Sequence, residues 1–79
     1  MSRQEIAEQV IGAIRVAYGD NRKEITEATY LIDDLGFSSL DVMEMIGELE
    51  ERFACTIDED NLEHFVQVKD IVEYIDGCQ

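Results

Sequence analysis

Two adjacent hydroxyl side chains, Ser38 and Ser39, stand where the sequence predicts the start of a helix. Ser38 and Asp41 have the spacing of a capping box, and Gly36 before them allows a tight turn. A serine in the first turn of a helix lies beside unpaired backbone N–H groups and the positive end of the helix dipole. A phosphate esterified there is held favourably. On these residues alone, simple capping by both serines is the more economical interpretation.

Other side chains offer little material for catalysis. The chain has one histidine, His64, and two cysteines, Cys55 and Cys78, which form neither a CxxC pair nor a zinc-binding spacing. The acidic run at 58–60 fails as an EF-hand loop, because Glu63 stands where that loop needs glycine. We therefore expect no metal site and no enzyme activity. Both thiols are expected to be free in a reducing cytoplasm, with Cys55 buried and Cys78 in a terminal tail.

The charge of the chain is strongly negative. Nineteen acidic residues against six basic ones give a formal net charge of −13, with a pI near 4.1. Such a field repels nucleic acid and anionic membranes and attracts basic protein surfaces, although solubility alone could also explain it. Met1 is followed by polar residues rather than a signal peptide, and no apolar run is long enough to span a bilayer. We therefore expect a cytoplasmic protein that binds neither nucleic acid nor membrane.

Apolar residues at helical spacing predict the fold. With 79 residues, the chain fits one domain, spanning 1–79, with a thin core. The pattern predicts an all-α fold: a small four-helix bundle with three main helices, one short helix and a long first loop. The expected helices cover about 2–18, 38 or 39 to 52 or 53, 59–64, and 68 or 69 to 75.

Local signals mark the ends of these helices. A capping box from Ser2 to Glu5 opens the first helix, and Gly19 and Asn21 suit the turn that ends it. Gly77 is expected to end the last helix. The connection from 20 to about 37 contains enough apolar residues to lie against the core rather than extend into solvent.

The segment around the two serines resembles the signature of the acyl carrier protein family, usually written L-G-x-D-S-L-D. In this chain it reads Leu35-Gly36-Phe37-Ser38-Ser39-Leu40-Asp41. The resemblance extends to the acidic second helix and the second half of the chain, and covers essentially its whole length. Serine replaces the family's aspartate at position 38, and serine caps a helix about as well. The resemblance therefore implies Ser39 as the attachment serine and Ser38 as the N-cap.

The resemblance also implies a cofactor and partners. A phosphopantetheinyl transferase would use coenzyme A and Mg²⁺ to attach 4'-phosphopantetheine to Ser39. The carrier would hold acyl groups as thioesters on that arm and catalyse no reaction itself. The implied partners are this transferase and the synthases, reductases and acyltransferases of fatty-acid or related acyl-chain synthesis, each with a basic docking patch. We expect the carrier to be a monomer.

Acidic and apolar side chains share one stripe of the second expected helix. Exposed carboxylates there would steer basic partners, and apolar side chains would anchor them, although a charged stripe can also be a plain solvated face. Many relatives carry a larger apolar residue at Gly47 and a small one at Glu48. The candidate docking residues are Leu40, Asp41, Met43, Glu44, Gly47, Glu48 and Glu51.

Two alternatives stay open at this point. One is a specialised carrier for a polyketide or lipid pathway, favoured by the departures at Phe37-Ser38 and Gly47, whereas the strong acidity favours the separate enzymes of fatty-acid synthesis. The other is an unmodified acidic helical interaction domain, which fits the charge and the helices equally well.

Overall fold

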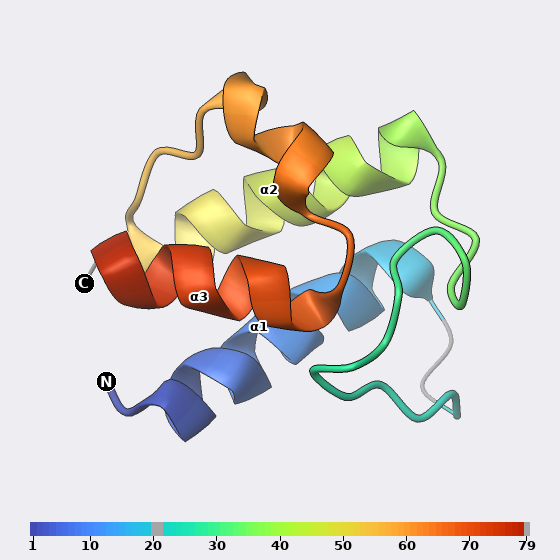
Figure 1. Ribbon diagram of the computed structural model, residues 1–79, viewed down its shortest axis with the longest axis horizontal. Helices are drawn as coiled ribbons and strands as arrows, with labels where there is room; N and C mark the ends of the chain where they lie inside the picture. The colour runs from blue at the N-terminus through green and yellow to red at the C-terminus, as the bar shows by residue number, and fades with distance from the viewer. Residues whose placement is uncertain (20–21, 79) are drawn as a thin grey trace.

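The computed structural model describes residues 1–19 and 22–78 and has the predicted all-α fold (Figure 1). Within these residues, three α-helices and one short 3₁₀ helix follow one another, with a long loop after the first, as expected. The elements are α1 (Arg3–Tyr18), α2 (Ser39–Phe53), the 3₁₀ helix η1 (Glu59–His64) and α3 (Val68–Cys78).

Both ends of α1 form as the sequence predicts. The Ser2 hydroxyl accepts a hydrogen bond from the Glu5 N–H at 3.2 Å, and the Glu5 carboxylate accepts one from the Ser2 N–H at 3.1 Å. The bond from the Ser2 N–H, followed by an interaction of the Ser2 hydroxyl with the same carboxylate, holds the pKa of the Glu5 carboxyl below its ordinary value of 4.5. Gly19 ends the helix with φ +81°, a left-handed conformation that glycine adopts without strain. Asn21 lies outside the described residues.

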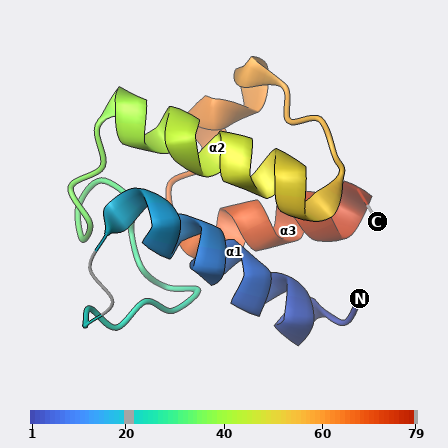
Figure 2. The same ribbon diagram turned by 180° about the vertical axis from the view of Figure 1, so that it is seen from behind.

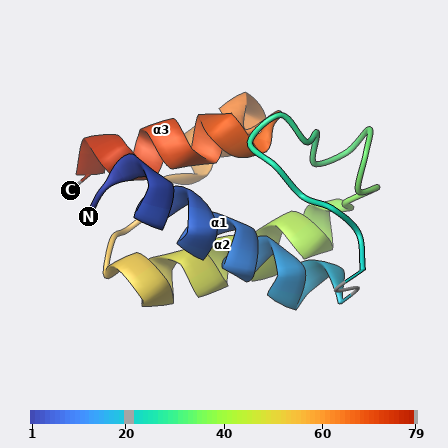
Figure 3. The same ribbon diagram turned by 90° about the horizontal axis from the view of Figure 1, so that it is seen from below.

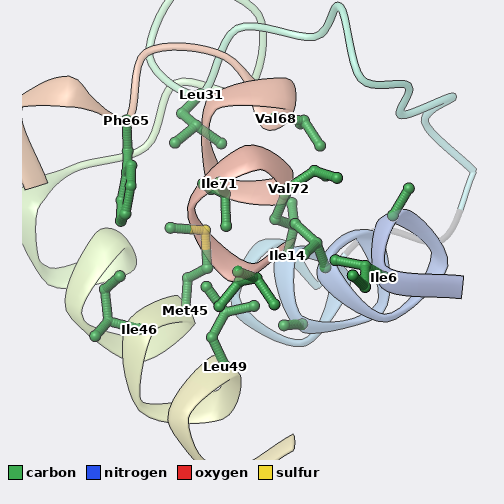
Figure 4. Packing of buried hydrophobic residues seen from close by; sticks show 14 of the residues in the cluster. Ile6, Ile14, Leu31, Met45, Ile46, Leu49, Phe65, Val68, Ile71 and Val72 are labelled. Carbon is green, nitrogen blue, oxygen red and sulfur yellow. The ribbon is translucent and has the colours of Figure 1, made fainter. Parts of the chain in front are cut away.

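The core lies where the three α-helices meet. α1 packs against both α2 and α3 (Figures 2 and 3). In Figure 4, Met45 of α2 points toward Ile71 of α3, with Ile14 of α1 beside them. Val42 of α2 lies one turn before Met45 on the inward stripe, but it is only half-buried at the edge of this core. The largest fully buried side chains are Ile6, Val10, Ile14, Leu31, Met45, Leu49, Val68, Ile71, Val72 and Ile75.

Backbone hydrogen bonds hold the first loop against the start of α3. The Leu31 N–H donates to the Val66 carbonyl, and the Val68 N–H donates to the Thr29 carbonyl, both at 3.0 Å. The loop buries Ile25, Leu31 and Leu35 in the core, which confirms that it is pinned there. Its Tyr30 and Ile32 side chains, 39% and 67% exposed, instead face the surface.

The C-terminal segment differs from the prediction. α3 continues to Cys78, so Gly77 does not end it. The reason is conformational: among the glycines of the described residues, only Gly19 and Gly36 have a positive φ, and Gly77 keeps helical geometry. Cys78 therefore lies in the last turn of α3 rather than in a tail.

The short helix η1 is loosely seated. Asp58 is its N-cap, and the Asp58 carboxylate accepts a hydrogen bond from the Asp60 N–H at 3.1 Å. None of its residues is buried.

No helix in the described part of the chain is long and apolar enough to cross a bilayer.

Candidate functional site

A glycine turn sets the position of the two serines. Gly36 has φ +68°, and its N–H donates to the Ile32 carbonyl at 2.9 Å. The turn buries the next side chain, Phe37, and leaves Ser38 in an extended conformation at the start of α2. Because only glycine adopts this φ without strain, Gly36 fixes where the helix begins.

Ser38 is the N-cap of α2, as predicted. Its hydroxyl accepts from the Asp41 N–H at 3.3 Å and donates to the Asp41 carboxylate at 3.0 Å. The same carboxylate accepts from the Ser38 N–H at 2.9 Å. The Ser38 hydroxyl and the Asp41 carboxylate are thus both engaged within the capping box.

Ser39 is in a different situation one residue later. It is the first residue of α2, its side chain is exposed, and no described residue hydrogen-bonds to its hydroxyl. It stands in the helix turn whose backbone N–H groups have no intrahelical partners. Of the two adjacent hydroxyls, that of Ser39 is therefore the one without a hydrogen-bond partner among the described residues.

An open groove of about 490 Å³ lies beside Ser39. Its walls come from the first loop, the start of α2 and η1, and they are mainly apolar. A second hollow of about 260 Å³ continues from it and shares Ile32, Leu62 and Glu63 as lining residues. The first groove is lined by Ile32, Phe37, Ser38, Ser39, Val42, Met43, Leu62 and Glu63.

Sequence reasoning missed Ile32, Leu62 and Glu63 as part of this site. Ile32 belongs to the loop and Leu62 to η1, thirty positions apart in the chain. Helical periodicity relates neighbours within one element, so it carries no signal for this contact. The one available hint was Leu62 itself, an isolated apolar residue in an otherwise polar short helix.

Most of the expected docking residues share the solvent side of α2. Leu40 is 69% and Met43 48% exposed, and Glu44, Gly47 and Glu51 are exposed on the same stripe. Asp41 and Glu48 are only half-exposed and have partners within α2. Asp41 belongs to the cap, and the Glu48 carboxylate lies 3.9 Å from Nε of Arg52.

No group of three or more His, Cys, Asp or Glu side chains in the described residues is arranged to hold a metal ion. The acidic side chains instead spread over the surface of the bundle, and several engage caps or ion pairs.

The site fits a covalently attached phosphorylated group. Ser39 offers a hydroxyl without a described partner, and the Ser39 and Leu40 N–H groups of the first turn, which also lack one, are open to a phosphate. The groove offers an apolar surface to an arm. Fold and site thus define the class of carrier domains with a prosthetic group. Residues 8–75 match the family profile described as "Phosphopantetheine attachment site".

Relatives identify the family further. The chain is 40% identical over 76 residues, 96% of each chain, to an acyl carrier protein of Exiguobacterium sibiricum. It is 39% identical to the one of Thermotoga maritima, over 95% of this chain and 93% of that one. A solved structure of a candidate acyl carrier protein from Mycobacterium tuberculosis superposes with a TM-score of 0.86 at 27% identity, covering 94% of this chain and 99% of that one.

The chain belongs to the acyl carrier protein family. It therefore carries a phosphopantetheine prosthetic group, as the family does. Members of this family are carriers rather than enzymes, and they interact with the enzymes of acyl-chain biosynthesis.

Proposed function

We propose that residues 1–79 form one acyl carrier domain in which Ser39 bears 4'-phosphopantetheine. The observation that carries the proposal is the division between the two serines: Ser38 is engaged in the capping box, whereas the Ser39 hydroxyl is exposed and unbonded among the described residues. The chain itself holds the arm and catalyses no reaction.

The Ser39 oxygen is the nucleophile when the arm is attached. It forms a bond to the phosphorus of coenzyme A next to the pantetheine, and adenosine 3',5'-bisphosphate leaves. The hydroxyl proton passes to a base of the phosphopantetheinyl transferase. The resulting phosphodiester is negatively charged, and the N–H groups of the first turn of α2 stabilise that charge. Once bound, the group supplies a thiol that forms thioesters with acyl groups.

The groove beside Ser39 receives the arm or the beginning of its acyl chain. Its apolar side chains, among them Phe37, Val42 and Leu62, favour methylene groups over water. The wall formed by η1 buries none of its residues, so moving it outward disrupts little core packing.

The exposed stripe of α2 meets the partner enzymes. Leu40 and Met43 anchor the contact, while Glu44 and Glu51 attract a basic surface, with Gly47 leaving open space between them. Asp41 and Glu48 contribute charge from partly engaged positions. The partners are a phosphopantetheinyl transferase and the synthases, reductases and acyltransferases of acyl-chain synthesis.

The pathway is fatty-acid synthesis or a related acyl-chain synthesis in the cytoplasm, and the carrier works as a monomer. The net charge of −13 supports encounters with separate basic enzymes. A specialised polyketide or lipid pathway is the second candidate, and Gly47 favours it. Among the described residues, no atom other than those of its chain neighbours and its own helix backbone lies within 4 Å of an added Cβ at this position, so the docking stripe has a gap here.

Acyl transfer tests the proposed function. The arm-bearing chain is incubated with an acyl-coenzyme A and an acyltransferase of fatty-acid synthesis, and its intact mass is measured. We expect one acyl addition that neutral hydroxylamine removes, as it removes thioesters, and no addition on Ser39→Ala. An arm-bearing chain that accepts no acyl group from any such enzyme would contradict a carrier function in this pathway and favour the specialised one.

A further inference from the structure

The two cysteines lie together at the end of the molecule opposite the groove. Cys55 is in the connector just after Ala54, whose left-handed conformation with φ +51° turns the chain at the end of α2. Cys78 is in the last turn of α3. Figures 1, 2 and 3 agree that the start of this connector and the end of α3 lie side by side.

The two thiols lie close enough to interact. Cys55 is half-buried against the core, Cys78 is exposed, and both are reduced. The neighbouring Cys78 thiol, followed by burial of Cys55 and the nearby Glu50 carboxylate, raises the pKa of the Cys55 thiol to about 11. Cys55 is therefore a protonated thiol at neutral pH, next to a more accessible one.

We propose that Cys55 and Cys78 form a reversible disulfide within one chain when the surroundings become oxidising. The bond closes residues 55–78 into a ring that contains η1 and α3. It joins two segments that lie side by side in the fold (Figures 1 and 2), which is the arrangement that a disulfide needs. The ring includes Leu62 and Glu63, which line the groove beside Ser39.

The difference in exposure between the two thiols sets the order in which they react. The Cys78 thiolate attacks one sulfur of glutathione disulfide, which leaves a mixed disulfide on Cys78 and releases one glutathione. Cys55 then gives its proton to water, attacks the Cys78 sulfur and releases the second glutathione. The chain loses two hydrogens and is oxidised, while glutathione disulfide is reduced to two thiols.

The proposal does not depend on the attachment of the arm. Ser39 begins α2 and the connector follows its end, and α2 has 15 residues. At 1.5 Å per residue, about 20 Å of helix separates the cysteines from the attachment site. A Ser39→Ala chain, which has no arm and no arm thiol, therefore serves as the test protein beside the wild type.

The test is the mass of the chain after equilibration with glutathione disulfide. Remaining thiols are blocked with N-ethylmaleimide, and the protein is denatured and weighed. We expect Ser39→Ala to lose two hydrogens and take up no maleimide, equally at tenfold different protein concentrations. Arm-bearing wild type should form the same disulfide and show one maleimide or glutathione adduct, on the arm thiol alone. Cys55→Ser and Cys78→Ser, unable to close the ring, are expected to end as glutathione adducts or maleimide adducts.

A second readout is the melting temperature of the oxidised chain. Closing a ring restricts the unfolded chain, so we expect the oxidised wild type to melt about 10 °C higher than the reduced one, a difference absent from Cys55→Ser. Two maleimide additions on Ser39→Ala would overturn the proposal. So would a stable glutathione adduct on Cys78 or a disulfide between two chains. None of these results bears on loading at Ser39.

Discussion

Adjacent serines differ in what their hydroxyls can do because only one of them belongs to the helix cap. Ser38 gives its hydroxyl to the Asp41 backbone and carboxylate, and Ser39 keeps its own free of described partners. Helix geometry causes this difference, since the N-cap side chain folds back over the first turn while the next side chain projects outward. The replacement of the family's aspartate by Ser38 therefore keeps the cap and leaves the proposed attachment site unchanged.

The turn at Gly36 should matter for both stability and loading. Gly36→Ala places an alanine at φ +68°, which costs about 1–2 kcal/mol of unfolding free energy. Gly19→Ala is the matched control, since Gly19 has φ +81° at the far end of the first loop. We expect both variants to lose similar stability in urea unfolding, and only Gly36→Ala to slow phosphopantetheine loading. Equal loading rates in the two variants would show that the turn does not position Ser39.

At the scale of single elements, α2 has the proposed docking role. Glu44→Lys should slow loading by a transferase about two- to fivefold at low salt, because it weakens attraction to a basic partner. At high salt the slowing should be smaller, because ions screen that attraction. Glu8→Lys, the same charge change on an exposed position of α1, is the control and should have little effect. The initial rates of phosphopantetheine loading of the two variants measure both effects. Equal slowing by the two variants would assign the effect to net charge rather than to the α2 stripe.

Gly47 also lowers the stability of α2. Gly47→Ala should raise the free energy of unfolding by about 1 kcal/mol, since alanine favours the helix and its Cβ meets no atom within 4 Å. Gly12→Ala should gain less. There the added Cβ would lie 2.7 Å from Nη1 of Arg52, which must move and give up its 2.9 Å hydrogen bond to the Gln9 side chain. Urea unfolding measures the free energy of unfolding of both variants. An equal gain in that free energy at both positions would contradict this account of the α1–α2 contact.

Local signals predicted the elements well and their mutual contacts poorly. The boxes at Ser2 and Ser38 and the turn at Gly19 each depend on residues within one helical turn, so the sequence reveals them directly. Gly77 misled the prediction because glycine accepts both helical and left-handed backbone.

Contacts between distant segments had no such signal. The meeting of Ile32 and Leu62 in the groove and that of Cys55 and Cys78 depend on how the first loop, η1 and α3 pack. Partial burial of Glu48 beside Arg52 was equally hidden, because helical spacing alone placed Glu48 on the solvent side. The assignment of Ser39 over Ser38 came from family resemblance, and the hydrogen bonds give it a physical reason.

For the molecule as a whole, the net charge of −13 acts on both stability and encounters. Carboxylates crowded on a small bundle repel one another, and salt screens that repulsion. We expect the melting temperature to rise by about 5 °C or more between low salt and 0.5 M NaCl. Magnesium chloride at matched ionic strength separates screening from ion binding. A melting temperature that stays constant or falls with salt would mean that self-repulsion does not limit stability.

The central claim is that Ser39 carries the arm. Its most direct test is the intact mass of wild type, Ser39→Ala and Ser38→Ala after incubation with coenzyme A, Mg²⁺ and a broad-specificity phosphopantetheinyl transferase. Circular dichroism first shows that each variant is folded, since Ser38→Ala loses a cap of about 1 kcal/mol. We predict one phosphopantetheine addition on wild type and Ser38→Ala and none on Ser39→Ala. Loading of Ser39→Ala but not Ser38→Ala, or no loading of folded wild type while a known carrier loads in parallel, would contradict the claim.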